Sequence, residues 1–172
     1  ASAILNTSIA EGFGLTFLEP WLFGKGLLGR NLPDITADFK AQGIDLSPLY
    51  SALPIPKDSL CLSTLECAIQ KGLEQAYAIY EQPLPNDAVE RAFKAIHCGP
   101  EHIDFGGLDE SHQVAIIREV QQNPAVRDLL KAHLKVELAS NQQIENNAAA
   151  VQTCYNEKVY IQKLQHIYQQ AL

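Results

Sequence analysis

The spacing of apolar residues divides the chain into two parts. Before about residue 50, short apolar runs alternate with glycine-containing turns and amphipathic stretches. A short apolar run between turn residues is typical of a buried strand, whereas apolar residues at i, i+3 and i+4 are typical of a helix. Their alternation is the pattern of a parallel α/β sheet. The predicted elements of this part are a strand at 2–5, a helix from about Phe13 to Phe23, a strand at 27–29 and a helix from Asp34 to Gln42.

After residue 56 the helical spacing dominates. The segment 47–56 is rich in proline and serine, which predicts a loop or an edge segment, and a boundary. The segment 97–107 contains four glycine and proline residues and also predicts a loop. The expected helices lie at 57–81, 86–96, 109–122, 124–138, 141–153 and 156–171. In the first of these helices the apolar face consists of Leu62, Leu65, Ile69, Leu73, Ala76 and Tyr80.

Composition narrows the class of protein. The chain has 172 residues, 47% of them hydrophobic and 19% charged, which is ordinary for a soluble globular protein. Its apolar runs are shorter than the roughly 18 residues of a membrane helix, and the best candidate is interrupted by Glu19. The net charge is −7 with scattered Lys and Arg, which argues against a nucleic-acid partner. We therefore expect no integral membrane segment and no nucleic acid.

The four cysteines lack the C-x-x-C spacing of zinc sites. Such a scattered set predicts reduced, buried thiols and a cytoplasmic protein. A metal at the histidines and acids between residues 97 and 112 is an alternative, but their spacing matches no recognised ligand pattern. We therefore expect no metal site.

The segment Glu11-Gly12-Phe13-Gly14-Leu15, with Glu19 eight positions after Glu11, carries the candidate chemistry. A strand, a glycine turn and a helix start follow one another, so free backbone N–H groups would face the carboxyl edge of the sheet. That geometry binds anions, above all phosphates. On one continuous helix the two carboxylates would lie about 12 Å apart, which is too far for a shared acid/base pair. They could instead hold two parts of one long ligand, such as a nucleotide sugar. The simpler alternative is a glycine turn before an ordinary helix.

The form E-G-F-G-L-x-x-x-E resembles the signature of retaining glycosyltransferases of the GT-B fold, especially family 4. The continuation to Ile35 is similar to the same family, and the resemblance extends over residues 2 to about 43. It implies an α/β fold: the second half of a Rossmann-like donor-binding domain at 1–50, followed by a mostly helical C-terminal region at 51–172. It also implies a donor site. The first Glu of the motif would contact the donor sugar, the amides of the turn would hold the diphosphate, and the second Glu would bind the ribose hydroxyls.

Carried onto this chain, those roles give one catalytic residue, Glu11. The donor-binding residues would be Gly12, Phe13, Gly14, Leu15, Thr16 and Glu19. The expected ligands are a nucleotide-diphosphate sugar and an acceptor hydroxyl compound, with no separate cofactor. Because such enzymes have two Rossmann-like domains, we expect this chain to be a C-terminal portion that works with an N-terminal acceptor domain.

The chain departs from the family pattern at several positions. Pro20 lies inside the motif helix, where it removes a backbone hydrogen bond. Lys25-Gly26 replaces a small residue and proline, and neither Lys25 nor Arg30 takes the place of the basic pair that neutralises the diphosphate. The alternative function is a non-catalytic helical interaction or regulatory module with a vestigial donor motif.

Overall fold

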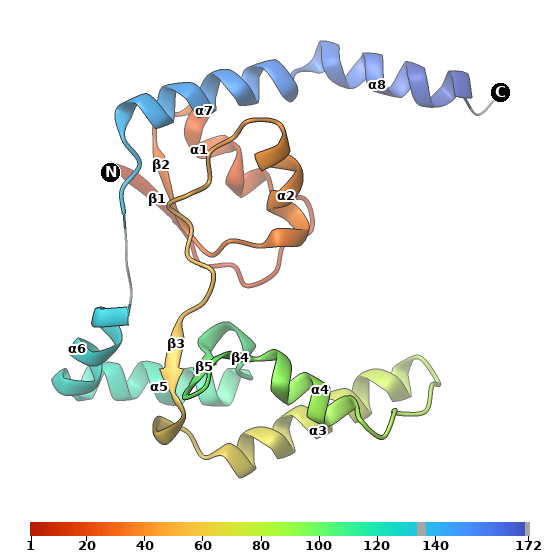
Figure 1. Cartoon of the computed structure of the whole chain (residues 1–172). Coiled ribbons are helices and arrows are strands. Elements are labelled where there is room, and N and C mark those ends of the chain that lie inside the picture. The colour runs from red at the N-terminus through yellow and green to blue at the C-terminus, as the bar shows by residue number, and fades with distance from the viewer. Residues whose placement is uncertain (134–136, 171–172) are drawn as a thin grey trace. The chain divides into compact units, whose positions relative to one another are not determined.

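The computed structural model of the protein describes residues 1–133 and 137–170. The chain is mixed α/β and mostly helical, which confirms the predicted class at that level (Figure 1). It divides into two compact units: unit 1 contains Ala1–Ser51 and Val136–Leu172, and unit 2 contains Ala52–Lys135. Both ends of the chain thus belong to unit 1. The domain limits predicted at residues 50 and 51 stay a prediction.

Unit 1 consists of a small sheet, three short helical elements and two long helices. Their bounds are β1 (Ala3–Asn6), the 3₁₀ helix η1 (Leu15–Phe17), α1 (Glu19–Leu22), β2 (Gly26–Gly29), α2 (Pro33–Ala41), α7 (Asn141–Cys154) and α8 (Glu157–Gln170). The last two correspond to the helices predicted at 141–153 and 156–171, apart from position 171, which lies outside the described residues. Within residues 1–133 and 137–170, no helix is both long enough and apolar enough to cross a membrane.

β1 and β2 pair in parallel, with Ala3 opposite Gly26 and Asn6 opposite Gly29. The described sheet has these two strands. The strand predicted at 2–5 is confirmed, with its bounds shifted by one residue. Parallel strands are normally covered on both faces. Here Ile4 is 41% and Leu5 is 66% exposed, and because successive strand residues point to opposite faces, both faces of β1 are partly open.

The predicted continuous helix from Phe13 to Phe23 is wrong. Two short elements replace it, η1 and α1, and Leu18 is the residue between them. Pro20 explains the interruption, because proline has no N–H for an intrahelical hydrogen bond and fits the first turn of a new helix. Pro20 occupies that first-turn position in α1.

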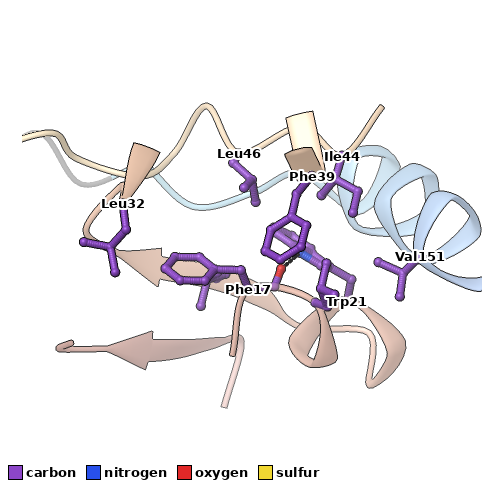
Figure 2. Packing of buried hydrophobic residues seen from close by; sticks show 9 residues of the cluster. Phe17, Trp21, Leu32, Phe39, Ile44, Leu46 and Val151 are labelled. Atoms are coloured by element: carbon purple, nitrogen blue, oxygen red, sulfur yellow. Dashed lines mark hydrogen bonds between the residues drawn. The ribbon is translucent and has the colours of Figure 1, made fainter. Parts of the chain in front are cut away.

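Large side chains from both ends of the chain form the core of unit 1 (Figure 2). Trp21 is 1% exposed, and its Nε1 donates a hydrogen bond of 2.8 Å to the carbonyl oxygen of Phe17. Val151 of α7 packs into this cluster of residues otherwise drawn from the first 46 positions. Asn147, also on α7, is fully buried and pairs with the backbone of Asp45, accepting from its N–H and donating to its carbonyl, both at 2.8 Å.

Unit 2 combines four helices with a three-stranded sheet. Its elements are β3 (Pro54–Pro56), η2 (Lys57–Ser59), α3 (Leu62–Ile79), α4 (Ala88–Ala95), β4 (His97–Gly99), β5 (His102–Asp104), η3 (Phe105–Gly107), α5 (Glu110–Gln122) and α6 (Pro124–His133). The helix predicted at 124–138 is described as far as His133; residues 134–136 lie outside the described part, and 137–140 are not helical.

The loop predicted at 97–107 is wrong. β5 pairs antiparallel with both β3 and β4, so the segment 47–56 also contributes a strand. These strands have three residues each, which is too short for an alternating pattern to be recognised. Asp104 supports the arrangement, because its Oδ1 accepts hydrogen bonds from the N–H groups of Leu53, at 3.0 Å, and Gly106, at 3.3 Å.

The apolar face predicted for the first helix of unit 2 is covered only in part. Leu65 of α3 is fully buried in a cluster with Ile55, Ile103 and Ile116. Towards the C-terminal end of α3, Ile79 and the adjacent Tyr80 are 78% and 76% exposed. Periodicity thus identified the helix correctly but overestimated how much of its face is buried.

Candidate functional site

The candidate site lies at the end of β1. Asn6, the last residue of the strand, is 9% exposed and uses both ends of its amide. Its Nδ2 donates to Thr16 Oγ1 at 3.0 Å, and its Oδ1 accepts from the Ser8 N–H at 2.8 Å. The amide therefore links the end of β1 to Ser8, at the start of the turn, and to Thr16 in η1. The carboxyl ends of parallel strands are where ligands bind in open α/β sheets.

Glu11 joins this network through Thr16, whose hydroxyl donates to Glu11 Oε1 at 3.2 Å. The side chain of Ser8 contributes most to lowering the pKa of Glu11; burial opposes this effect, and Thr16 and Asn6 add to it. Glu11 is therefore ionised at neutral pH. An ionised carboxylate accepts hydrogen bonds from hydroxyl groups and cannot act as an acid.

Gly14 shapes the turn. It adopts a left-handed conformation with φ 70°, and a Cβ at this position would lie 2.3 Å from Ile35 Cγ2 and 3.0 Å from the ring of Phe39. The missing side chain thus makes room for the core of unit 1. A Cβ on Gly12 would meet nothing within 4 Å, and Phe13 beside it is 89% exposed.

Glu19 and Thr16 line a hollow of about 270 Å³, together with Asn6, Thr7 and Phe23. Glu19 is the first residue of α1, and its side chain is exposed. Because η1 and α1 are separate elements, the 12 Å helical spacing expected between Glu11 and Glu19 does not apply. Leu15 differs from these residues, since it lines another hollow with residues of α7 and α8.

The end of β2 adds polar groups at the same edge of the sheet. Gly29 lies opposite Asn6, and a Cβ on it would come within 2.7 Å of the Asn6 carbonyl oxygen. Half-buried Arg30 follows Gly29, and its backbone forms an isolated parallel β-bridge with Tyr50. Next, Asn31 Oδ1 accepts from Thr36 Oγ1 at 2.7 Å and from Lys40 Nζ at 2.9 Å. Two side-chain networks thus follow the two strands.

The structure joins some of the predicted site residues and separates others. Glu11 and Thr16 are hydrogen bonded, and Thr16 shares a hollow with Glu19. Phe13 and Leu15 are not part of that hollow, since Phe13 is 89% exposed and Leu15 lines a different hollow. Sequence reasoning missed Asn6, the residue on which the network depends. Its signal was a polar residue at the end of a short apolar strand, directly before the turn.

Residues that could bind a metal or react as thiols were also predicted from the sequence. Among residues 1–133 and 137–170, no three His, Cys, Asp or Glu side chains are grouped so that they could hold a metal ion. The prediction of buried cysteines is wrong at three of four positions, because Cys61, Cys67 and Cys98 are exposed. Cys98 lies on β4, Cys67 lies on α3 and Cys61 directly precedes α3.

Comparison of the chain with models of protein families, with curated proteins and with solved structures found no match.

Proposed function

We propose that unit 1 forms part of a Rossmann-like donor-binding domain of a retaining glycosyltransferase, which transfers a sugar from a nucleotide-diphosphate donor to an acceptor hydroxyl. The observation that carries the proposal is the network of Asn6, Thr16 and Glu11 at the carboxyl edge of a parallel strand pair, beside the hollow that Glu19 lines. The E-x7-E resemblance supports the same assignment.

In this proposal Glu11 binds the donor sugar. Its lowered pKa keeps it an acceptor for sugar hydroxyls, and such a charged hydrogen bond is about twice as strong as a neutral one. If the sugar acquires positive charge as its bond to the diphosphate breaks, the carboxylate stabilises that charge more than the ground state. Glu11 would therefore contribute to turnover more than to affinity.

Glu19 would bind the ribose hydroxyls from the wall of the hollow. The diphosphate would lie at the turn, where Gly14 precedes η1 and no described side chain caps the helix start. Because η1 has three residues and α1 has four, a long helix dipole is not available. Individual N–H groups of Leu15 and Thr16 would supply the contacts, and stabilising the departing diphosphate would be their catalytic effect.

The second candidate, a non-catalytic interaction module, is favoured by one observation. On α8 several apolar side chains are exposed: Tyr160 63%, Ile161 44%, Ile167 57% and Tyr168 67%. A contiguous apolar surface of this kind is typical of a contact with another protein. Nucleotide binding at Thr16 and Glu19 separates the two candidates, because the interaction module does not require it.

The test is titration of the chain with uridine, guanosine and adenosine diphosphates, followed by NMR. We expect one nucleotide at millimolar concentration to shift the amide signals of Asn6, Thr16 and Glu19. Glu19→Ala should weaken that binding by about tenfold or more, the effect of losing a charged hydrogen bond of roughly 1.5–3 kcal/mol. Glu145→Ala, an exposed carboxylate on α7, is the matched control. Absence of shifts for all three nucleotides, or shifts confined to other residues, would refute the proposal.

A further inference from the structure

A larger hollow, of about 670 Å³, lies in unit 2 where α3 and α5 begin. Its polar wall contains Cys61, Thr64, Ser111 and His112. Apolar side chains, including that of Ile116, complete it. A thiol, two hydroxyls and an imidazole thus open onto one volume large enough for a small molecule, and none of them belongs to the site at the end of β1.

His112 is held in a fixed orientation within this hollow. Its Nδ1 is hydrogen bonded to Asp109 Oδ2, and its Nε2 lies 3.1 Å from Thr64 Oγ1. Asp109 is itself held, because its Oδ1 accepts from both the N–H and the hydroxyl of Ser111 at 2.9 and 2.6 Å. The imidazole therefore connects the start of α5 to the start of α3.

Cys61 is the residue that precedes the first turn of α3, an 18-residue helix. Its Sγ lies 3.4 Å from Ser63 Oγ, and the Thr64 hydroxyl donates to its carbonyl oxygen at 2.8 Å. Hydrogen bonds from Ser63 and then from Thr64 lower the pKa of Cys61 from 9.0 to about 7. The N-terminal end of a helix also favours a thiolate. His112, which holds Thr64, is a positioning residue for this thiol.

We propose that Cys61 and the hollow beside it form a thiol-modification site for small cationic disulfides. Charge selects this class of ligand. The titratable groups that line the hollow are Asp58 on η2 and His112 and Glu119 on α5, and its described lining includes no Lys or Arg. Two carboxylates in one cleft attract a cation and repel an anionic disulfide.

The reaction is a thiol–disulfide exchange. The Cys61 thiolate attacks one sulfur of the disulfide, a new Sγ–S bond forms and the original S–S bond breaks. The departing sulfur leaves with the electron pair as a thiolate and takes a proton from water. Cys61 becomes oxidised to a mixed disulfide, half of the ligand is reduced to a thiol, and the other half remains in the hollow.

The experiment is to treat the folded chain with cystamine, hydroxyethyl disulfide or glutathione disulfide, and to follow each cysteine by peptide mass spectrometry. Cys67, exposed on the same helix, is the internal reference. At pH 7, half of a thiol with a pKa of about 7 is ionised, against about 1% at 9.0. After correction for its lower nucleophilicity, the advantage in rate over an ordinary thiol is about sixfold. We expect Cys61 to react first, and fastest with cystamine.

One set of variants tests what lowers the pKa of Cys61, and a second set tests what selects a cationic disulfide. Ser63→Ala should raise the pH midpoint of Cys61 alkylation by iodoacetamide, and His112→Gln should raise it through Thr64. Ser59→Ala removes a hydroxyl that lines the hollow but is not among the groups that lower the pKa of Cys61, and it should leave the midpoint unchanged. Replacing Asp58 and Glu119 by their amides should remove the preference for cystamine. The proposal is overturned if Cys67 reacts as fast as Cys61, or if glutathione disulfide reacts as fast as cystamine.

Discussion

The cores of the two units are built from different residues and over different distances along the chain. Unit 1 buries Phe17, Trp21 and Phe39 and needs Val151, more than a hundred positions away, to complete the cluster. Unit 2 buries aliphatic side chains from a continuous stretch, such as Leu65 and Ile116. The contact between Asn147 and Asp45, 102 positions apart, belongs to the first pattern.

This difference shows where each unit is sensitive to substitution. Unit 1 depends on a few positions that accept only one residue type, since Gly14 has no room for a Cβ and Asn147 matches the two polar groups of one backbone residue. Unit 2 depends on periodic packing, and its helix α5 is capped by Asp109. The candidate donor site lies in the unit with the stricter requirements, as expected for a site that needs fixed geometry.

The largest expected effect is from Phe17→Ala, which would test whether the aromatic cluster stabilises unit 1. Phe17 is fully buried, and removal of a buried aromatic ring costs about 3–5 kcal/mol. Trp21 is the single tryptophan of the chain, so its fluorescence during urea unfolding reports on this core. If the free energy of unfolding falls by less than about 1 kcal/mol, the cost of a small core change such as Ile→Val, the aromatic cluster does not stabilise unit 1 as proposed.

Gly14→Ala should have the next largest effect. The substitution places a Cβ in a left-handed conformation, which costs about 1–2 kcal/mol, and forces it against Ile35 and Phe39, which costs about 1–3 kcal/mol more. The matched control is Gly12→Ala, which meets no neighbouring atom and should change the free energy of unfolding by less than about 0.5 kcal/mol. Equal effects of the two substitutions in thermal unfolding would show that the turn tolerates a side chain at both positions.

Asn147→Ala tests the long-range closure of unit 1. The change leaves the N–H of Asp45 without its buried partner, whereas the carbonyl keeps a hydrogen bond from Gln143 Nε2 at 3.2 Å. The expected cost is about 1–3 kcal/mol in the free energy of unfolding. Asn146→Ala, which removes an exposed amide on the same helix, is the control and should cost little. If both variants unfold at the same urea concentration, α7 is not held by this pairing.

Sequence reasoning succeeded where local pattern decides the structure. Periodicity placed α3, α5 and α7 within a few residues of their ends, because each carries apolar residues at helical spacing. It failed for β4 and β5, whose three residues each gain strand structure only from pairing with a distant segment. It failed also at Pro20. There the motif predicted one continuous helix, although proline has no N–H for the intrahelical hydrogen bond.

For the candidate site, the sequence predicted the glycine turn but not its supporting residue. Glu11, Thr16 and Glu19 stood out because they belong to a spaced motif. Asn6 did not, since its role depends on the turn folding back so that Thr16 lies 3.0 Å away. Likewise, the packing of Ile35 and Phe39 against Gly14 follows from tertiary structure alone.

The smallest effect tests how far the negative charge of the α5 cap stabilises unit 2. Asp109→Asn keeps a side chain that can cap α5 but removes the charge near the helix start, which is worth about 0.3–1 kcal/mol at low salt. Burial raises the pKa of Asp109, but hydrogen bonds from Ser111 and His112 outweigh this effect and hold the pKa below its ordinary value. A pKa lowered by folding stabilises the protein above the unfolded-state value of about 3.9, and this stabilisation disappears as the pH falls through the folded-state pKa. The variant should therefore be less stable than the wild type at pH 7 and equal to it in strong acid, as measured by urea unfolding at both pH values.

The control is Glu110→Gln. It removes a charge from the same turn of α5, but Glu110 makes no cap hydrogen bond. If the two variants give the same pH dependence, the effect comes from the helix dipole alone and not from the hydrogen bonds of Asp109.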